Sequence, residues 1–391
     1  MSHVELAEGV YWVGAIDWNI RNFHGYTTPR GTTYNAYLIV DEKIALIDTV
    51  KAPFAAEMLD RIGEIVDPSR IDYMVSNHVE MDHSGAIPEV LRRSQATVVT
   101  AERGKKGLTR VYKSDWPFQV VKEGDELPLG RRRLQFIEAP MLHWPDNILA
   151  YLPEQQILFS SDAFGQHIAS SWRYADQVPY VFSEAAKYYA NIVMPYASMV
   201  LRALEKLEGK GIELVAPSHG LLWRGPELQQ GIQAYTDWSQ GVARDKVLIC
   251  YDSMWGSTDK MARALLEGIV RGGVEVSLYN LTLTDWSETI KEVLDAKAVL
   301  IGSPTLNKGL FPTVAGFLAY LKGLKPKGKL GASFGSYGWS GGAVTAANQE
   351  LKAAGIEVID SGLEFSHVPD SEELEKCVAF GEKIAQQVKS R

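Results

Sequence analysis

Cysteine is scarce in this sequence, which has only Cys250 and Cys377 among 391 residues. Two thiols are too few for a disulfide scaffold, a cysteine-rich zinc site or an iron–sulfur cluster held by this chain alone. The scarcity is typical of a protein from a reducing compartment, so we expect a cytoplasmic location.

Long apolar runs, a leader and an excess of basic charge are also lacking. The chain begins Met-Ser-His-Val-Glu-Leu-Ala-Glu, without the basic and apolar regions of a signal peptide. No stretch reaches the roughly 18 uncharged apolar residues of a membrane span, so we expect no membrane association. The formal net charge of −8 argues against nucleic acid as a partner.

The pattern of apolar residues changes at residues 239–246. Before this segment, strands and helices are mixed, which predicts a four-layer αββα sandwich in residues 1–245. After it, strands and helices alternate, which predicts a doubly wound parallel sheet of five strands in residues 246–391. The expected strands are 10–15, 34–40, 44–49, 71–76, 97–101, 134–139, 150–152, 157–160, 214–216, 247–251, 274–280, 298–302, 330–334 and 356–359. The expected helices are 53–66, 183–207 (bent near Pro195), 226–238, 258–271, 286–295, 312–324, 343–354 and 371–389.

Seven residues of metal-ligand type follow expected strands or lie in loops rich in Pro and Gly. Any one of them alone reads as an ordinary polar loop residue, but their recurrence favours a metal site. A structural zinc site fits poorly because such sites prefer thiolates. The seven are His78, Glu80, Asp82, His83, His143, Asp162 and His219.

Four imidazoles and three carboxylates exceed the needs of one tetrahedral ion. They suit two ions about 3.5–4 Å apart that share one bridging carboxylate. Asp162 is the best bridge, because it stands alone in the sequence between His143 and His219. The share of carboxylates favours iron or manganese over zinc.

The run His78-Val-Glu80-Met-Asp82-His83, with the later histidines and Asp162, resembles the metallo-β-lactamase-like domain of flavodiiron proteins. Hydrolases of this fold have histidine where this chain has Glu80. The resemblance implies one iron held by His78, Glu80 and His143, another held by Asp82, His83 and His219, and Asp162 shared by both. One histidine is displaced from the metal in some members, which leaves open whether His83 and His143 both ligate.

Four further residues of this region have two readings each. Asp48 ends a strand, where it either hydrogen-bonds a ligand loop or caps a turn. His24, Tyr26 and His167 either line the pocket and supply protons or have ordinary surface and core roles.

Three loops of the second half follow expected strands and are rich in small and hydroxyl residues. The first joins a strand to a helix, so its N–H groups suit a phosphate, yet it lacks the lysine of a P-loop and the GxGxxG spacing of dinucleotide folds. Together the loops resemble those of a flavodoxin, which binds FMN. The residues concerned are Ser253, Met254, Trp255, Gly256, Ser257, Thr258, Pro304, Thr305, Leu306, Asn307, Ser336, Tyr337, Gly338, Trp339, Gly341 and Gly342.

The resemblance to flavodiiron proteins covers nearly the whole chain. It implies reduction of O2 to water, of NO to N2O, or of both, at a diiron centre supplied with electrons through FMN. It also implies a head-to-tail homodimer or a dimer of such dimers, with Trp339 near the partner's irons. The chain has no pair of CxxC motifs, so the electron donor is expected to be a separate protein such as rubredoxin, or alternatively a deazaflavin.

Two other functions stay open at this point. One is a zinc-dependent hydrolase of the metallo-β-lactamase type with a flavodoxin attached, which Glu80 disfavours. The other is an electron-transfer flavoprotein that reduces no gas, which the seven ligand positions disfavour. Metal analysis distinguishes the three possibilities, because they require two irons, zinc or no metal.

Overall fold

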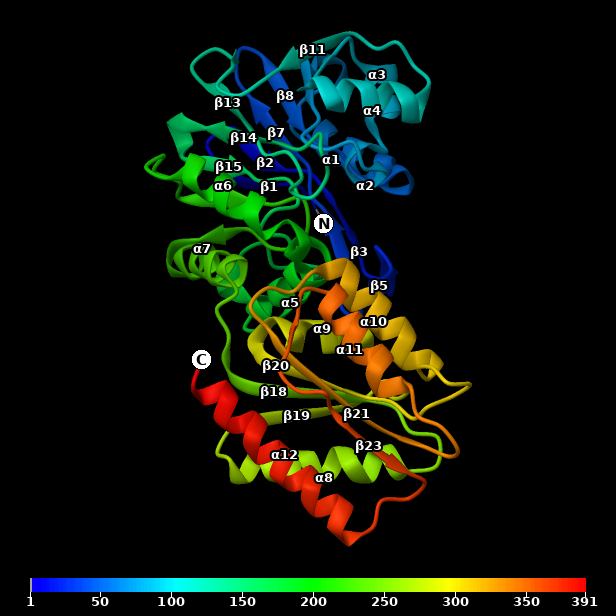
Figure 1. The fold of residues 1–391 in the computed structure, drawn as a ribbon. Coiled ribbons are helices and arrows are strands. Elements are labelled where there is room, and N and C mark those ends of the chain that lie inside the picture. Colours follow the sequence, from blue (N-terminus) through cyan, green and yellow to red (C-terminus); the bar gives the residue numbers. More distant parts are fainter. Residues whose placement is uncertain (1) are drawn as a thin grey trace. The chain divides into compact units, whose positions relative to one another are not determined.

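The computed structural model describes residues 2–391, which form two compact units (Figure 1). The first unit runs to Tyr189 and also includes Tyr196–Thr236. The second consists of Ala190–Pro195 and Asp237–Arg391. The division expected between residues 245 and 246 stays a prediction.

The described residues of the first unit form two large sheets. The seven-stranded sheet has the order β1 (Val4–Ala7), β2 (Val10–Trp12), β7 (Tyr37–Val40), β8 (Ile44–Ile47), β9 (Tyr73–Val75), β10 (Thr97–Ala101) and β11 (Phe118–Val121). The six-stranded sheet has the order β12 (Glu126–Pro128), β13 (Arg133–Glu138), β14 (Ile148–Leu152), β15 (Ile157–Phe159), β16 (Leu214–Ala216) and β17 (Trp223–Arg224). Two small ribbons pair β3 (Ala15–Asp17) with β6 (Thr32–Tyr34) and β4 (Asn22–Phe23) with β5 (Tyr26–Thr27).

Strand β8 shows why the central strands are apolar without a break. Successive side chains of a strand point to opposite faces. Ala45 and Ile47 lie in the core between the two sheets, whereas Ile44 and Leu46 lie in the core on the other face. Both faces of β8 are therefore buried, which places this sheet inside the sandwich and confirms the predicted αββα architecture.

Helices cover the outer faces of both sheets (Figure 1). α1 (Ala55–Gly63), α3 (Ile87–Arg93) and α4 (Glu102–Tyr112) pack on the seven-stranded sheet. α6 (Ala197–Leu207) and α7 (Gly225–Gln240) contribute side chains that pack with Leu149 of β14.

The helix expected over residues 183–207 is broken rather than bent. α5 (Val181–Tyr188) is followed by a π-helical turn at Tyr189–Val193 and a 3-10 turn at Met194–Tyr196, and only then does α6 begin. Pro195 has no N–H and its ring crowds the carbonyl four residues earlier. The interrupted segment also hydrogen-bonds elsewhere, since the Asn191 side chain donates to the Ser287 carbonyl at 3.1 Å.

The second unit is a parallel sheet with helices on both faces. Its order is β19 (Glu275–Asn280), β18 (Arg244–Tyr251), β20 (Ala296–Gly302), β21 (Leu330–Tyr337) and β22 (Glu357–Val358). α8 (Ser257–Arg271) and α12 (Ser371–Lys389) lie on one face, and α9 (Trp286–Asp295), α10 (Pro312–Leu324) and α11 (Ala343–Ala353) lie on the other (Figure 1). This order is that of a flavodoxin-like doubly wound sheet, as predicted.

The last strand of this sheet differs from the prediction. The expected strand 356–359 is reduced to β22, and β23 (Leu363–Ser366) pairs with the second half of β21. β23 alternates apolar and polar residues, but it is only four residues long and none of its side chains is fully buried. The sheet thus has six strands among the described residues, not five.

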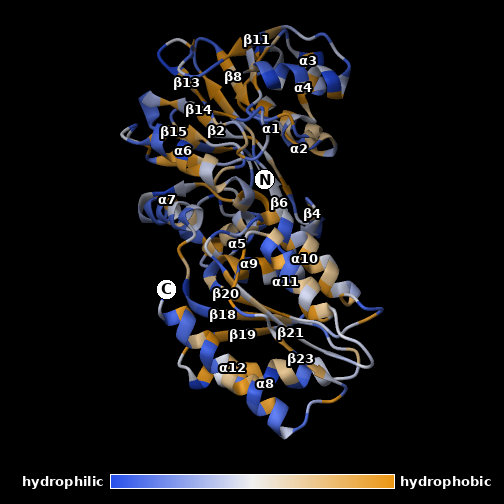
Figure 2. Ribbon diagram, in the orientation of Figure 1, coloured by the Kyte–Doolittle hydropathy of each residue, from blue (hydrophilic) through white to orange (hydrophobic). Residues whose placement is uncertain are grey.

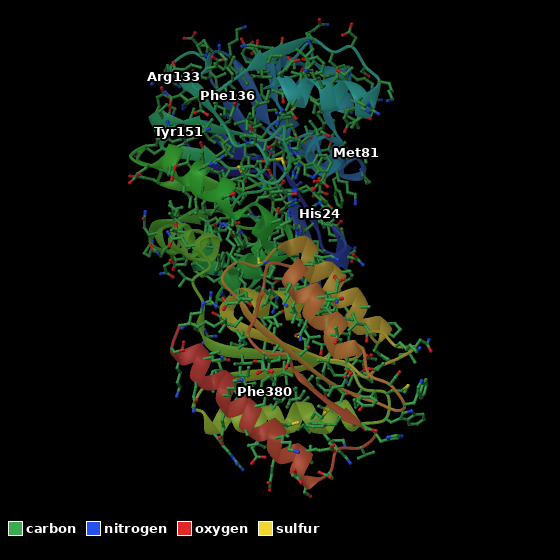
Figure 3. All side chains as sticks on the ribbon, in the orientation of Figure 1. His24, Met81, Arg133, Phe136, Tyr151 and Phe380 are labelled. Carbon is green, nitrogen blue, oxygen red and sulfur yellow. The ribbon has the colours of Figure 1, made fainter. Side chains whose placement is uncertain are left out.

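Buried apolar side chains hold each unit together. Phe136 lies in the core between the two sheets of the first unit, and Phe380 of α12 lies in the core of the second (Figure 3). Helices α8 and α12 show hydrophobic and hydrophilic colours together, as expected for helices with one buried side (Figure 2). Within residues 2–391, no helix combines the length and apolar character needed to cross a bilayer.

A buried lysine gives the second unit a testable pH dependence. Lys329 donates to the Leu294 carbonyl at 2.8 Å. Burial lowers the pKa of Lys329 from 10.5 to about 8, although Asp295 opposes this shift. The folded chain therefore binds fewer protons than the unfolded chain between pH 8 and 10.5, so the free energy of unfolding rises with pH across this window. The contribution of Lys329 is lost as the pH falls through 8.

We predict that Lys329→Met removes this dependence, which amounts to about 3 kcal/mol over the window. The free energy of unfolding of this unit, measured by denaturant titration at several pH values, checks the prediction. Lys327→Met, at an exposed position two residues earlier, is the control. Parallel stability curves for the parent and Lys329→Met would contradict the prediction.

Candidate metal centre

The seven predicted ligands lie close to the ends of a few strands. His78 and Glu80 follow β9. Asp82 and His83 lie on the short helix α2 (Met81–Ser84) rather than in an open loop. The remaining three lie between β13 and β14, after β15 and after β16, and they are His143, Asp162 and His219.

The structure gathers six of these residues into two groups of three. His78, Glu80 and His143 form one group, with one ligand atom of each lying within 4.8 Å of the others. Asp82, His83 and His219 form the second group by the same measure. Each group offers two imidazoles and one carboxylate. The side chains that sequence analysis divided between two metals are therefore divided in the same way in space.

Asp162 lies between the two groups and turns one oxygen to each. Its Oδ2 is 3.8 Å from Nε2 of His78 and 3.4 Å from Nε2 of His143. Its Oδ1 is 3.2 Å from Nε2 of His83 and 3.5 Å from Nε2 of His219. A carboxylate placed in this way can bridge two ions.

Buried polar atoms without partners show that the cluster fits metal ions. Among residues 2–391, no hydrogen bond is made by either Asp82 oxygen, by Oδ2 of Asp162, or by Nε2 of His83, His143 and His219. Buried polar atoms are almost always satisfied in native proteins. Apart from Oδ1 of Asp82, each of these atoms lies within 3.4 Å of another ligand of the cluster, so cations held between them would supply the missing interactions.

The electrostatics of the cluster lead to the same conclusion. Burial alone would raise the pKa of Asp162, but the His83 and His143 imidazoles hold it well below its ordinary value. Burial lowers the pKa of His83, but Asp82 and Asp162 outweigh this effect and raise it to about 9. These carboxylates need positive charge beside them, which a metal ion supplies in place of histidine protons.

Two partners behind the cluster orient its histidines, and sequence analysis did not single them out. Nδ1 of His78 lies 3.0 Å from Oδ2 of Asp146, and Nδ1 of His219 lies 2.7 Å from the Thr33 carbonyl. Each contact leaves Nε2 of the ring facing the cluster, as metal ligation requires. Asp146 could have been suspected from the sequence, because it lies in the same loop as the ligand His143.

Asp48 connects two ligand loops at the base of the cluster. Its Oδ1 accepts from the Asn77 N–H at 2.8 Å, and its Oδ2 lies 3.4 Å from the Ser218 hydroxyl. Burial raises the pKa of Asp48 to about 6. Asp48 was expected either to hydrogen-bond a ligand loop or to cap a turn. These contacts are hydrogen bonds to the ligand loops.

The three candidate pocket residues lie beside the cluster. Nε2 of His24 is 3.0 Å from Oε1 of Glu80. His167 packs its ring 4.9 Å from that of His219, and Tyr26 packs 5.6 Å from His167. Burial holds the pKa of His167 well below its ordinary value, so its imidazole is neutral.

The three loops of the second unit meet at the ends of β18, β20 and β21. Ser336 joins them, because its hydroxyl lies 3.1 Å from that of Thr258 and its carbonyl accepts from the Thr305 N–H at 2.8 Å. Gly256 precedes α8 with φ +84°, a conformation that favours glycine. The first-turn N–H groups of α8 have no partner within the helix, which suits a phosphate.

Aromatic side chains and two missed carboxylates complete these loops. Trp255 and Trp339 are 85% and 86% exposed, so both present aromatic surface for a flat ring. Asp252 accepts from the Ser253 N–H at 2.7 Å, and Glu364 accepts from the Gly342 N–H at 3.0 Å. Both carboxylates fix loop backbone, and sequence analysis passed over them because neither belongs to a loop motif.

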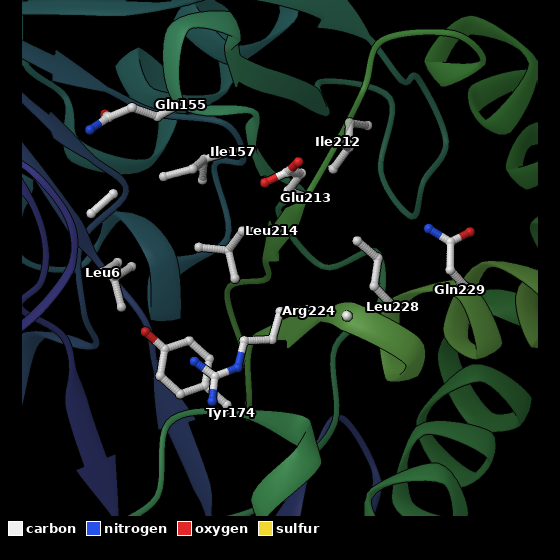
Figure 4. A pocket seen from close by; sticks show the side chains of 12 residues that line it. Leu6, Gln155, Ile157, Tyr174, Ile212, Glu213, Leu214, Arg224, Leu228 and Gln229 are labelled. Atoms are coloured by element: carbon white, nitrogen blue, oxygen red, sulfur yellow. The ribbon is translucent and has the colours of Figure 1, made fainter.

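A separate pocket of about 570 Å³ in the first unit contains none of the cluster residues (Figure 4). Apolar side chains such as Leu6 and Leu214 line it together with Arg224, whose guanidinium covers the Tyr174 ring at 3.6 Å. Arg224 is already paired with Asp176 at 2.9 Å. The chemistry of the unit therefore lies in the histidine–carboxylate cluster.

Comparisons with known proteins agree with this arrangement. The family model described as ODP family beta lactamase matches residues 32–220, and the flavodoxin model matches residues 249–381. The chain is 48% identical to the nitric oxide reductase of Moorella thermoacetica over 98% of both chains. The chain belongs to the flavodiiron protein family.

Solved flavodiiron structures share the whole fold of this chain. The rubredoxin oxygen:oxidoreductase of Desulfovibrio gigas is 42% identical, with a TM-score of 0.97 over 100% of this chain and 99% of that one. The flavodiiron protein of Giardia intestinalis is 36% identical, with a TM-score of 0.96 over 100% and 97%. The predicted family, fold class and oxidoreductase class are thus confirmed.

We predict that Asp162→Ala abolishes metal binding at both positions of the cluster. The carboxylate oxygens of Asp162 lie within 3.8 Å of Nε2 of all four candidate histidine ligands. Metal content per chain after reconstitution checks the prediction, with Asp176→Ala, which removes an exposed carboxylate, as the control. Retention of the parent's metal content by Asp162→Ala would contradict the bridging role.

Proposed function

We propose that this flavodiiron protein reduces O2 to water, NO to N2O, or both, with electrons from a separate donor that pass through FMN. The observation that carries the proposal is the position of Asp162 between two groups of equal composition. A site for a single ion would not need this symmetry. Glu80, where hydrolases of this fold have histidine, supports iron over zinc.

Two irons would be held by the residues that the two groups contain. His78, Glu80 and His143 would hold one, and Asp82, His83 and His219 the other, with Asp162 shared. When bound, the metals and the flavin together supply up to four electrons, which matches the four needed for O2 and exceeds the two needed for a pair of NO molecules.

FMN would be held by the three loops of the second unit. The residues from Ser253 to Thr258 would take the phosphate at the start of α8. The loops at 304–307 and 336–342 would flank the ring, and Trp339 offers it an aromatic face. The division into domains 1–245 and 246–391 belongs to this proposal.

Side chains that surround the metal ligands would also contribute to this reaction. Tyr188 donates to Oδ1 of Asp162 at 2.9 Å, and burial together with Asp162 raises its pKa well above 10, so it stays a donor. Its bond holds the carboxylate in the orientation that presents one oxygen to each group. We assign proton supply to His24, Tyr26 and His167, which lie beside the cluster.

The partners follow from the same proposal. A rubredoxin or a similar small redox protein would be the electron donor, and the protein would act in the cytoplasm. We propose a head-to-tail homodimer, alone or paired into a tetramer, in which the flavin of one subunit serves the irons of the other.

Cofactor content tests this function most directly. We expect two irons and one FMN per chain, and consumption of O2 or NO by the purified protein with reduced rubredoxin. Zinc in place of iron, with hydrolysis of esters or lactams, would contradict the proposal. FMN without any metal would also contradict it.

We predict that two inactive variants regain activity when their subunits exchange. One variant carries His78→Ala with Asp162→Ala and lacks metal, and the other carries Ser253→Ala with Gly256→Val and lacks FMN. A mixed dimer holds one intact metal cluster and one intact flavin on different chains. O2 consumption after mixing measures the recovery, and each variant mixed with itself is the control. If mass spectrometry shows exchange and no activity returns, the head-to-tail arrangement is wrong.

A further inference from the structure

The two metal groups have matching ligands but different partners behind them. Each group contributes two imidazoles and one carboxylate, and both share Asp162. Behind the first group, Nδ1 of His78 meets the carboxylate of Asp146 at 3.0 Å. Behind the second, Nδ1 of His219 meets the uncharged Thr33 carbonyl at 2.7 Å. One asymmetry therefore lies behind the ligands, in addition to the different carboxylates of the two groups and the deeper burial of the second group.

Asp146 is held rigidly in this position. The same oxygen that meets His78 also accepts from the Val79 N–H at 2.8 Å. The side chain is 4% exposed, so little water competes for it. The adjoining backbone is fixed as well, because the Ile148 N–H donates to the Asn77 carbonyl at 3.0 Å. Rotation of the carboxylate would cost a buried backbone hydrogen bond as well as the contact with His78.

Other charges near the cluster do not remove the difference between the groups. Asp48 contacts both the Asn77 and the Ser218 loops, so it is not specific to one group. In the second group, Nδ1 of His83 has no hydrogen-bond partner within the described chain. Asp146 is thus a buried carboxylate outside the ligand set that contacts an imidazole of the first group.

A carboxylate behind an imidazole has a known physical effect. It fixes the tautomer with the proton on Nδ1, aims Nε2 at the metal and increases the basicity of the ring. A neutral carbonyl fixes the tautomer but adds less electron density. The support that Asp146 provides is therefore specific to the position that His78 occupies.

We propose that Asp146 is a positioning residue that strengthens metal binding at the His78–Glu80–His143 position and not at the other one. In the parent the His78–Glu80–His143 position is consequently the tighter of the two, and loss of the Asp146 charge weakens that position and leaves the other unchanged. This inference rests on the proposed dimetal function.

Titration of the metal-free protein with Co²⁺, followed by its visible absorption, tests the inference. The variant is Asp146→Asn, which keeps the shape and removes the charge. Its matched control is Asp72→Asn, because Asp72 also accepts one backbone N–H, from Ile44 at 2.8 Å, and pairs with one side chain, Lys43 at 2.9 Å, away from the cluster.

The parent is expected to bind two Co²⁺ per chain. In Asp146→Asn one of the two binding steps weakens by about 10–100-fold and the other is unchanged. In Asp72→Asn both steps match the parent. A general loss of stability would weaken both steps in both variants, so the number of steps affected separates positioning from a merely structural role.

Two results would overturn the inference while leaving the proposed function intact. One is a parent that binds two ions and an Asp146→Asn variant that binds both ions as tightly as the parent does. The other is an equal weakening of both steps in that variant. A parent that binds fewer than two ions contradicts the proposed function, and the inference fails with it.

A second variant guards against a folding defect. The unfolding temperature of the metal-free protein is measured first for Asp146→Asn and Asp72→Asn. If Asp146→Asn does not fold, Asp146→Glu is titrated instead, because it keeps the charge behind His78. Asp146→Ala, which removes the charge, is titrated beside it. If Asp146→Glu binds Co²⁺ more tightly than Asp146→Ala at one step, the inference is supported. Equal binding by these two variants overturns it.

Discussion

The organisation of the first unit depends on one buried carboxylate surrounded by imidazoles. Asp162 is 1% exposed and lies within 3.8 Å of four histidine nitrogens. An arrangement of this kind is unfavourable unless opposite charge compensates it. The strands that end at the cluster, and the backing contacts of His78 and His219, all serve to hold these groups together. The fold brings the ligands to one place, and cations make that place stable.

Site residues that lie close together in the sequence could be predicted from it. His78, Glu80, Asp82 and His83 fall within one short run after an apolar strand, so their proximity follows from the local chain. The loop that precedes α8 was predictable for the same reason, because Gly256 and its hydroxyl neighbours act through local backbone geometry. The division of the ligands into two groups came from family resemblance, and the distances in the structure agree with it.

Features that depend on distant contacts were not predictable. Asp146 acts on His78 across the sandwich, and no local pattern marks that pairing. β23 was missed because its alternation of apolar and polar residues extends over only four residues, too short a run to indicate a strand by itself. The break between α5 and α6 needed more than Pro195, since the contact of Asn191 with Ser287 also draws the segment out of the helix.

The contacts of Asp48 have a consequence for how the protein is made. This one side chain meets Asn77 early in the chain and Ser218 much later. Because the ribosome makes the chain from its N-terminus, the first ligands are synthesised long before His219. The complete cluster can exist only after the segment around residue 219 has emerged and closed a long loop. Completion of the Asp82–His83–His219 position is therefore a late step in synthesis, whereas His78, Glu80, His143 and Asp162 are all made earlier.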